Sequence, residues 1–270
     1  MHKLVGVVGG KHSGKTTVIQ CLISKLRRRG CRVGSVKEMT RAYWIDVPGK
    51  DTWEHGRAGA EIVIAAPLNE TVCFIKRSPR LNETLPLFHG LDYVVLEGFE
   101  NEKTFPKIIA AKNAEEATAF SDGLAITISG IIAESDEEMR KASVLKIPIV
   151  NCETEAEKLA DIVEQRAFPS LPGLSHCGEC GYGSCYEFAK AIVAGRKTSK
   201  NCPLLMGDDV VIEVNGSRIP LKWFPRVIIK NIVIGVVSSL NGMKEIGEVK
   251  IVVRKDYVGA PCDFTTARQV

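Results

Sequence analysis

The stretch from Lys3 to Thr17, KLVGVVGGKHSGKTT, decides the fold of the first part of the chain. The apolar run Lys3–Val8 predicts a buried strand, and residues 14–29 carry apolar side chains at helical spacing, which predicts a helix. Between them, residues 9–16 read GGKHSGKT and fit the phosphate-binding pattern GxxxxGKT. The alternative is a tight glycine turn that only joins a strand to a helix. The strand–loop–helix setting favours the phosphate-binding loop.

Each residue type in this loop suits a nucleotide. Glycines let successive backbone amides turn toward an anion, and the N-terminus of the following helix adds its dipole. We expect Lys15 to reach the β and γ phosphates, the Thr16 hydroxyl to bind Mg²⁺, and Thr17 to lie near the α phosphate. The expected nucleotide-binding residues of the loop are Gly9, Gly10, Lys11, His12, Ser13, Gly14, Lys15, Thr16 and Thr17.

Outward from the loop, strand-like runs alternate with helical or loop segments as far as about residue 165. Near-continuous apolar strands that alternate with helices are typical of a mostly parallel sheet with helices on both faces. The sequence therefore predicts an α/β fold resembling the P-loop NTPases, closed by a helix over 153–165. The further strands are expected at 32–36, 61–65, 71–75, 93–96, 107–111, 124–129 and 147–151.

An acidic residue follows one of these strands. In residues 93–98, YVVLEG, Glu97 comes after four apolar residues. A carboxylate at that place either faces the cleft at the carboxyl end of the sheet, forms a surface ion pair, or is buried without a partner at a severe cost. We interpret Glu97 as the acid that helps to hold Mg²⁺ and, with Lys15, as a catalytic residue. Asp92, at the other end of this strand, is interpreted as a solvated entry residue.

A polar segment lies earlier, at residues 46–60, DVPGKDTWEHGRAGA. Its acids, bases, histidine and glycines are dense for a passive loop, and loops of this chemistry often close over a ligand. Asp46, Gly49, Lys50 and Asp51 are its candidate binding residues. The alternative is an ordinary solvated turn in which Asp51 begins a helix.

The chain divides most naturally into three parts. Residues 1–167 form the nucleotide-binding domain, and residues 167–174, AFPSLPGL, read as a linker because they hold two prolines and a glycine. Residues 168–206 form a four-cysteine module, which we expect to fold separately. Residues 207–270 predict a small ββαβ module with strands at 210–214 and 218–221, an Asn215–Gly216 turn, a helix over 224–240 and a last strand at 248–253.

Four of the nine cysteines cluster as HCGECGYGSC, followed after sixteen residues by CP. Four thiolates hold either an iron–sulfur cluster or a zinc ion, and uncomplexed thiols are a third possibility. Only one CxxC pair occurs, and small residues surround it, which favours a [4Fe-4S] cluster; the segment also resembles the short four-cysteine domain of corrinoid iron–sulfur proteins. The expected ligands are Cys177, Cys180, Cys185 and Cys202, with adjacent His176 as a possible substitute. The isolated cysteines, interpreted as small buried apolar residues, are Cys21, Cys31, Cys73, Cys152 and Cys262.

Composition excludes other classes of protein. The chain has 36 basic and 32 acidic residues, 45% of it is hydrophobic, and its formal net charge is +4. That small surplus argues against a nucleic-acid partner. The longest apolar stretch, near 227–240, is broken by Lys230, which argues against a membrane span. We expect a cytoplasmic protein.

Three segments together resemble the MobB family, the GTP-binding adaptor proteins of molybdopterin guanine dinucleotide synthesis. They are GxxxxGKTT, then VKEMTRAYWIDVPGKDTWEHGRAGA, then VVLEGF, and the resemblance covers residues 1 to about 165. It implies a homodimer that binds GTP with Mg²⁺ and hydrolyses it slowly, so that any enzymatic activity is at most that of a weak GTPase. It implies as partners the guanylyltransferase that attaches GMP to molybdopterin and the maturation factors of molybdopterin enzymes.

The chain departs from the family at two places. Lys37, Glu38 and Met39 stand where family members carry Lys-His and further histidines, and Ile128-Ser129-Gly130 stands where they carry Ala-Ser-Asp. No NKxD sequence occurs, so guanine preference rests on the resemblance. A second hypothesis is a redox protein in which nucleotide binding or hydrolysis gates electron transfer through the cluster. A third, a small-molecule kinase, lacks a distinct base at an acceptor site beyond Asp46 and Asp51.

Overall fold

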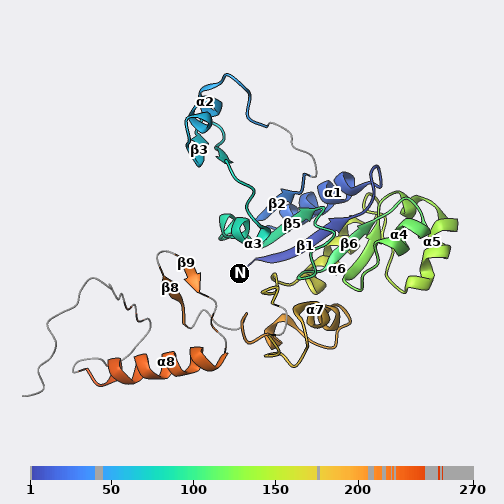
Figure 1. Ribbon diagram of the computed structural model, residues 1–270. Coiled ribbons are helices and arrows are strands. Elements are labelled where there is room, and N and C mark those ends of the chain that lie inside the picture. Colours follow the sequence, from blue (N-terminus) through green and yellow to red (C-terminus); the bar gives the residue numbers. More distant parts are fainter. Residues whose placement is uncertain are drawn as a thin grey trace, which may run out of the picture. The chain divides into compact units, whose positions relative to one another are not determined.

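The computed structural model describes residues 2–39, 45–174, 177–205, 210–214, 217–219, 221, 223–240, 249 and 251 (Figure 1). Contacts between Cα atoms divide the chain into two compact units, Met1–Met206 and Gly207–Val270. The first unit carries the phosphate loop and the four cysteines.

A five-stranded parallel sheet forms the centre of the first unit, with the strand order β2-β5-β1-β6-β7. The predicted α/β fold with a parallel sheet is confirmed. The run 147–151 contributes only an isolated parallel bridge between Ile149 and Ile128. The strands are β1 (Lys3–Val8), β2 (Val33–Lys37), β5 (Tyr93–Glu97), β6 (Lys107–Ala110) and β7 (Ala125–Ser129).

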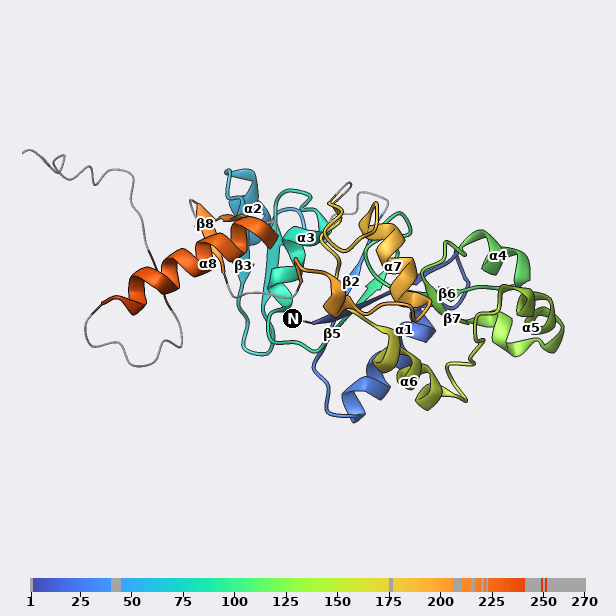
Figure 2. The same cartoon turned by 90° about the horizontal axis from the view of Figure 1, so that it is seen from below.

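One face of the sheet is covered by α1 (Lys15–Arg28) and α6 (Ala156–Arg166), which lie side by side (Figure 2). Because side chains alternate along a strand, Val5 and Val7 of β1 point to this face and pack with Leu22 of α1. The apolar positions of α1 recur at helical spacing and are buried, as the sequence predicts.

The opposite face takes the alternate residues. Leu4 of β1 packs there with Val94, Leu96 and Phe105, and the short helix α3 (Leu81–Thr84) closes that cluster. At the β6–β7 end of the sheet a further cluster includes residues of α4 (Ala114–Ala119) and α5 (Asp136–Ala142). Helices therefore lie on both faces, as the sequence predicts.

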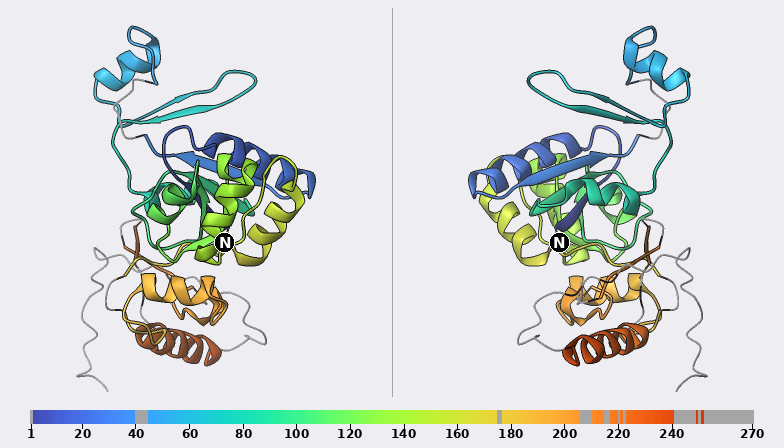
Figure 3. Two further views of the ribbon diagram at one scale, coloured as in Figure 1. Left: turned by 90° about the vertical axis from the view of Figure 1, so that its right-hand side faces the viewer. Right: turned by 90° about the vertical axis from the view of Figure 1, so that its left-hand side faces the viewer.

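A separate arm departs from the predicted arrangement. It consists of α2 (Asp51–Arg57), β3 (Ile62–Ala65) and β4 (Val72–Ile75), and the two strands pair antiparallel with each other, outside the parallel sheet (Figure 3). The hairpin leaves Ile62 and Ile64 more than half exposed, at 58% and 62%. Cys73 of β4 is exposed too, so its interpretation as a buried apolar residue is wrong.

The segment expected to be a linker packs onto the sheet. Phe168 forms an antiparallel bridge with Leu4 of β1, and the Leu171 amide donates to the Thr104 carbonyl at 2.9 Å. Phe168 and Leu171 are both 3% exposed because they join a buried cluster with Leu124, which precedes β7. The cysteine segment thus shares a core with the sheet instead of standing off from it.

The second unit contains a hairpin of β8 (Ile212–Val214) and β9 (Ser217–Ile219), followed by α8 (Trp223–Ser238). The predicted Asn215–Gly216 turn, the strand expected at 248–253, His176 and Cys262 lie outside the described residues. No helix in the described part of the chain is long and apolar enough to span a membrane.

Candidate functional site

The backbone of residues 9–14 turns sharply between β1 and α1. Gly9 has a φ of 148°, and a Cβ there would lie 1.9 Å from the carbonyl oxygen of Ala110. Gly14, which directly precedes α1, has a left-handed φ of 92°. Side chains other than hydrogen are disfavoured at both places. The two glycines of the motif are therefore required by the backbone path of the loop.

The ammonium group of Lys15 folds back over this loop. It donates hydrogen bonds to the carbonyl oxygen of Gly9, at 2.8 Å, and to that of Gly10. The buried Ser13 hydroxyl donates to the same Gly10 carbonyl at 2.9 Å. A cation held only by neutral carbonyls can exchange them for phosphate oxygens, which form stronger, charge-assisted bonds.

The remaining loop side chains face solvent. Lys11, His12, Thr16 and Thr17 are exposed, and the first turn of α1 holds no acidic residue. The positive end of the helix dipole is therefore free of competing carboxylates from its own turn. An anion can approach this helix N-terminus together with Lys15.

Glu97 lies at the same edge of the sheet. It is the last residue of β5 and stands in register with Val7 of β1 on one side and Lys37 of β2 on the other. One Glu97 carboxylate oxygen lies 2.9 Å from Lys37 Nζ, and the side chain is 16% exposed. Of the three arrangements considered for Glu97, the structure therefore shows the surface ion pair. The Lys37 side chain is 61% exposed, and such a pair contributes little and is readily exchanged.

Glu38 supports the turn after Glu97. Its carboxylate accepts a hydrogen bond from the Phe99 amide at 2.6 Å, and Phe99 has a positive φ of 58°. A non-glycine residue in that conformation is strained and needs such a restraint. Glu38 stands within the departure from the family pattern, and no motif in the sequence predicts this role.

Glu116 is a second residue that the sequence reasoning missed. A Cβ on Gly10 would lie 1.9 Å from Glu116 Oε1, so this carboxylate sits against the phosphate loop. Its other oxygen accepts from the Lys112 amide at 2.6 Å, and the side chain is 14% exposed. The available signal was Asn113, which caps α4 just beyond the carboxyl end of β6. Glu116 places a negative charge beside the site expected to take phosphates.

The arm residues are arranged around Asp46. Its carboxylate accepts from the Thr52 hydroxyl and from Lys76 Nζ, both at 2.7 Å. The Lys76 bond, then that of Thr52, holds the pKa of Asp46 below its usual value although burial opposes this. Gly49 has a φ of 81°, while Lys50 and Asp51 begin α2. These bonds stay inside the arm, which stands apart from β1 and α1, and do not bring Asp46 to the phosphate loop (Figure 3).

The cysteine segment is built around α7 (Cys185–Val193). The Ser184 hydroxyl caps this helix by accepting from the Glu187 amide at 3.2 Å, which sets Cys185 at its first position. Cys180, Cys185 and Cys202 all pack into the cluster that holds Phe188 and Leu124. Three of the four predicted ligands are thereby gathered in one small core.

The donor set fits a thiolate-bound metal centre. All four thiols are free, and burial raises the pKa of Cys185 and Cys202, to which the charges of neighbouring thiolates add. A bound cation is what favours the thiolate form in such surroundings. Within the described ranges, no three Cys, His, Asp or Glu side chains already converge as metal ligands. The glycines at 178, 181 and 183 leave open space in this segment, because nothing lies within 4 Å of their would-be Cβ atoms.

Two protein families match separate parts of this chain. Residues 4–133 match MobB, described as molybdopterin guanine dinucleotide synthesis protein B, and this range contains the phosphate loop, the arm and Glu97. Residues 4–133 are a MobB family domain. Residues 171–204 match a second family, described as "Putative Fe-S cluster", and include all four predicted ligand cysteines. The resemblance to MobB, with an appended iron–sulfur domain, is confirmed at the level of families.

Relatives of the MobB domain extend over much of the chain. A protein of Methanocaldococcus jannaschii named "Putative molybdopterin-guanine dinucleotide biosynthesis adapter protein" is 27% identical over 92% of this chain and 96% of its own. The adapter protein of Haemophilus influenzae is 34% identical over 39% of this chain and 61% of its own. The crystal structure of Bacillus subtilis MobB, 23% identical, covers 62% of this chain and 99% of its own with a TM-score of 0.50, a likeness of fold.

Proposed function

We propose that this protein is an adapter of molybdopterin guanine dinucleotide synthesis that binds GTP with Mg²⁺ and assists the guanylyltransferase. The observation that carries the proposal is the placement of Lys15, in a glycine loop at the end of β1, and of Glu97 at the same sheet edge, within a MobB domain. The names of the relatives supply the pathway, and the guanine base and the transferase partner are proposed from them.

Each residue has a defined task in the proposed nucleotide site. Lys15 exchanges its two loop carbonyls for the β and γ phosphates, and the exposed Thr16 hydroxyl and Glu97 hold Mg²⁺. The bound metal ion neutralises charge on the phosphates. Thr17 lies near the α phosphate. We assign at most slow, magnesium-dependent hydrolysis of GTP, as the resemblance to the MobB family implies.

We propose a homodimer, with the exposed hairpin of the arm as its interface. Ile62 and Ile64 project from one face of β3, and Cys73 opposite Ile64 is exposed too. An isolated two-stranded hairpin is marginally stable, and both of its edges offer unpaired backbone groups to another strand. Pairing with a second copy satisfies these groups and covers the apolar face.

We propose a [4Fe-4S] cluster on Cys177, Cys180, Cys185 and Cys202. Such a cluster supplies one-electron chemistry or a structural staple when bound. Anaerobic purification followed by iron, sulfide and zinc assays tests this part of the proposal. About four iron and four sulfide per chain are expected, and one zinc per chain without sulfide contradicts the cluster.

Nucleotide binding is tested with Lys15→Ala, and Lys141→Ala is the matched control because Lys141 lies on the exposed surface of α5. Lys15→Ala is expected to lower GTP affinity at least a hundredfold, measured by calorimetry with Mg²⁺, while Lys141→Ala leaves it unchanged. Competition with ATP reports base preference, and guanylyltransferase turnover with and without the protein reports assistance. Unchanged GTP affinity in folded Lys15→Ala overturns the proposed site.

One observation favours a second candidate function, in which the nucleotide gates electron transfer through the cluster. Residues 98–106 begin directly after Glu97 and reach the cysteine segment, where the Thr104 carbonyl accepts from the Leu171 amide and Lys103 Nζ lies 5.6 Å from the Tyr186 ring centroid. Tyr186 follows Cys185. The cluster's reduction potential, measured with and without GTP, separates the two functions, because only gating requires it to change.

A further inference from the structure

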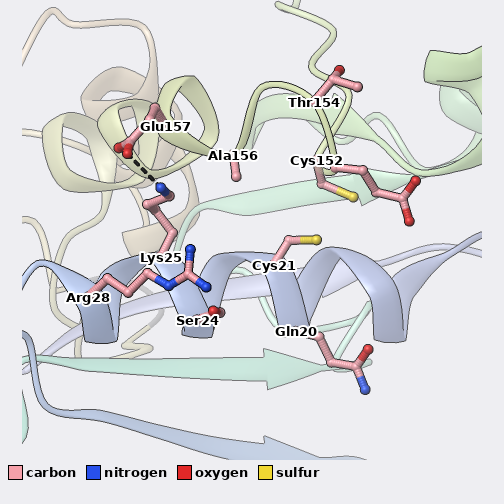
Figure 4. A pocket seen from close by; sticks show the side chains of 10 residues that line it. Gln20, Cys21, Ser24, Lys25, Arg28, Cys152, Thr154, Ala156 and Glu157 are labelled. Carbon is pink, nitrogen blue, oxygen red and sulfur yellow. Dashed lines mark hydrogen bonds and ion pairs between the residues drawn. The ribbon is translucent and has the colours of Figure 1, made fainter.

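Two of the isolated cysteines meet in the first unit. Cys21 lies on α1 and Cys152 lies four residues before α6, and both line an open cavity of about 490 Å³. Figure 4 shows their sulfur atoms pointing toward each other across this cavity. Cys21 also contributes to raising the pKa of the Cys152 thiol, as a close neighbour does. Such proximity is unexpected for residues interpreted as independent apolar side chains.

Ion pairs hold α1 in the position that brings Cys21 there. Cys21, Lys25 and Arg29 follow one another at intervals of four and so share one stripe of α1. Lys25 binds the Glu157 carboxylate at 2.5 Å, and Arg29 binds Glu157 and Asp161, at 2.5 and 2.8 Å. These ion pairs fix the position of α1 along α6. Cys21 lies one helical turn before Lys25.

The backbone at Cys152 is restrained as well. The Val150 amide donates to Ile128 at 2.9 Å, and the Val150 carbonyl accepts from the Ser129 hydroxyl at 2.6 Å. On the other side, the Asn151 side chain accepts from the amides of Glu153 and Thr154. Contacts of neighbouring residues therefore restrict the backbone at both cysteines, so little conformational freedom has to be lost when the two thiols meet.

We propose that Cys21 and Cys152 form a reversible disulfide, a redox site separate from the four-cysteine module and from the phosphate loop. The oxidant is a low-molecular-weight disulfide that enters through the cavity. Cys21 is partly exposed and Cys152 is 5% exposed, so the sulfur of Cys21 is the one that the oxidant reaches first.

The exchange balances in two steps. The Cys21 thiolate attacks one sulfur of the oxidant, forms a mixed disulfide and releases one thiolate, which takes up the proton that Cys21 lost. The Cys152 thiolate then attacks the Cys21 sulfur and releases the second thiol in the same way. The two cysteines lose two electrons and two protons, and the small disulfide becomes two thiols. Burial, and then the neighbouring Cys21, raises the pKa of the Cys152 thiol, so Cys152 is the less readily ionised of the two before the first step.

The test uses the full chain, purified without oxygen and equilibrated in buffers of reduced and oxidised glutathione. Peptide mapping by mass spectrometry without reduction is expected to find a peptide that links residues 21 and 152. The link is expected to disappear with excess dithiothreitol and in Cys21→Ser and Cys152→Ser. In Cys152→Ser, glutathione is expected to remain on Cys21. Cys73→Ser, which removes an exposed thiol of the arm, is the matched control and is expected to leave the link unchanged.

A second measurement does not depend on recovery of that peptide. Oxidation is expected to raise the thermal midpoint of the wild-type protein and of Cys73→Ser, but not that of Cys21→Ser, because a disulfide joining distant residues restricts the unfolded chain. The proposal is overturned if glutathione modifies Cys73 while Cys21 and Cys152 stay reduced. It is also overturned if the wild-type protein forms no peptide linking residues 21 and 152 at any ratio of oxidised to reduced glutathione.

Discussion

Asp122→Ala removes the carboxylate that holds a buried ammonium group between the sheet and the cysteine segment. Lys107, in β6, has a side chain only 2% exposed, and its Nζ donates to one Asp122 oxygen at 2.8 Å and to the Glu100 carbonyl at 2.7 Å. Lys103 binds the same oxygen at 2.6 Å. The backbone carbonyl of Asp122 accepts from the Tyr186 hydroxyl at 2.6 Å. The variant removes the ion pair but keeps the backbone carbonyl that accepts from Tyr186.

The size of the effect follows from burial. Removing one partner of a buried ion pair costs about 3–5 kcal/mol, whereas an exposed pair contributes about 1 kcal/mol or less. Lys103 is 38% exposed and can turn to water, and Lys107 keeps its bond to Glu100, which places the expected loss near 3 kcal/mol, at the lower end. Burial also lowers the pKa of Lys107, so its deprotonation limits the penalty.

Urea unfolding followed by circular dichroism measures this loss. For a slope of about 2–3 kcal/mol per molar urea, the midpoint of Asp122→Ala is expected to fall by about 1 M. Glu137→Ala, which breaks an exposed pair on α5, is the matched control and is expected to shift the midpoint by less than about 0.3 M. The double variant Asp122→Ala with Lys107→Met is expected to recover at least half of the loss, because no buried charge remains.

The loss of stability in Asp122→Ala is also expected to depend on pH. Because the folded pKa of Lys107 lies below its usual value of 10.5, the unfolded chain binds more protons between those two values, and stability rises with pH. The deficit of Asp122→Ala is therefore expected to shrink between pH 7 and pH 10. A midpoint for Asp122→Ala that equals that of Glu137→Ala at pH 7 refutes the reasoning.

The remaining predictions concern the phosphate loop and the cysteine segment. Glu97→Gln is expected to lower magnesium-dependent hydrolysis at least tenfold and to change GTP affinity without Mg²⁺ less than threefold; equal losses in both assays would make Glu97 a structural residue. Glu116→Gln is expected to tighten GTP binding severalfold, because a carboxylate beside the phosphate loop repels a phosphate; weaker binding contradicts this. Ser184→Ala removes the cap of α7, at about 1 kcal/mol, and is expected to speed iron loss to a chelator, while Ser135→Ala, which uncaps α5, is not.

The parallel sheet and the phosphate loop could be predicted because their signals are local. A strand buried on both faces reads as a continuous apolar run, and the glycines of the loop are needed by the backbone itself, as the close approach of Ala110 to Gly9 illustrates. Glu97 could be placed because parallel strands end at one edge. Its ion-pair partner Lys37 could not be predicted. The two residues are neighbours because β2 pairs with β5, and neither segment alone reveals that strand order.

Contacts between segments distant in the sequence could not be predicted. The runs at 61–65 and 71–75 were expected as strands of the sheet, yet they pair only with each other, because a short apolar run does not reveal its partner. Cys21 and Cys152 each look like isolated apolar residues, and only the register of α1 on α6 brings them together. Lys107 gave no signal of burial, since its partner Asp122 lies in a different loop.

The same reasoning explains why the cysteine segment joins the sheet. Residues 167–174 hold the prolines and glycine of a linker, but Phe168 and Leu171 within them are apolar, and their burial stabilises packing of this segment on the sheet. Because the Leu171 amide bonds to the Thr104 carbonyl, the cysteine segment is tied to residues 98–106, which directly follow Glu97. The proposed metal centre would therefore share a core with Leu124 of the MobB domain, and we expect loss of the metal to lower the stability of that domain as well.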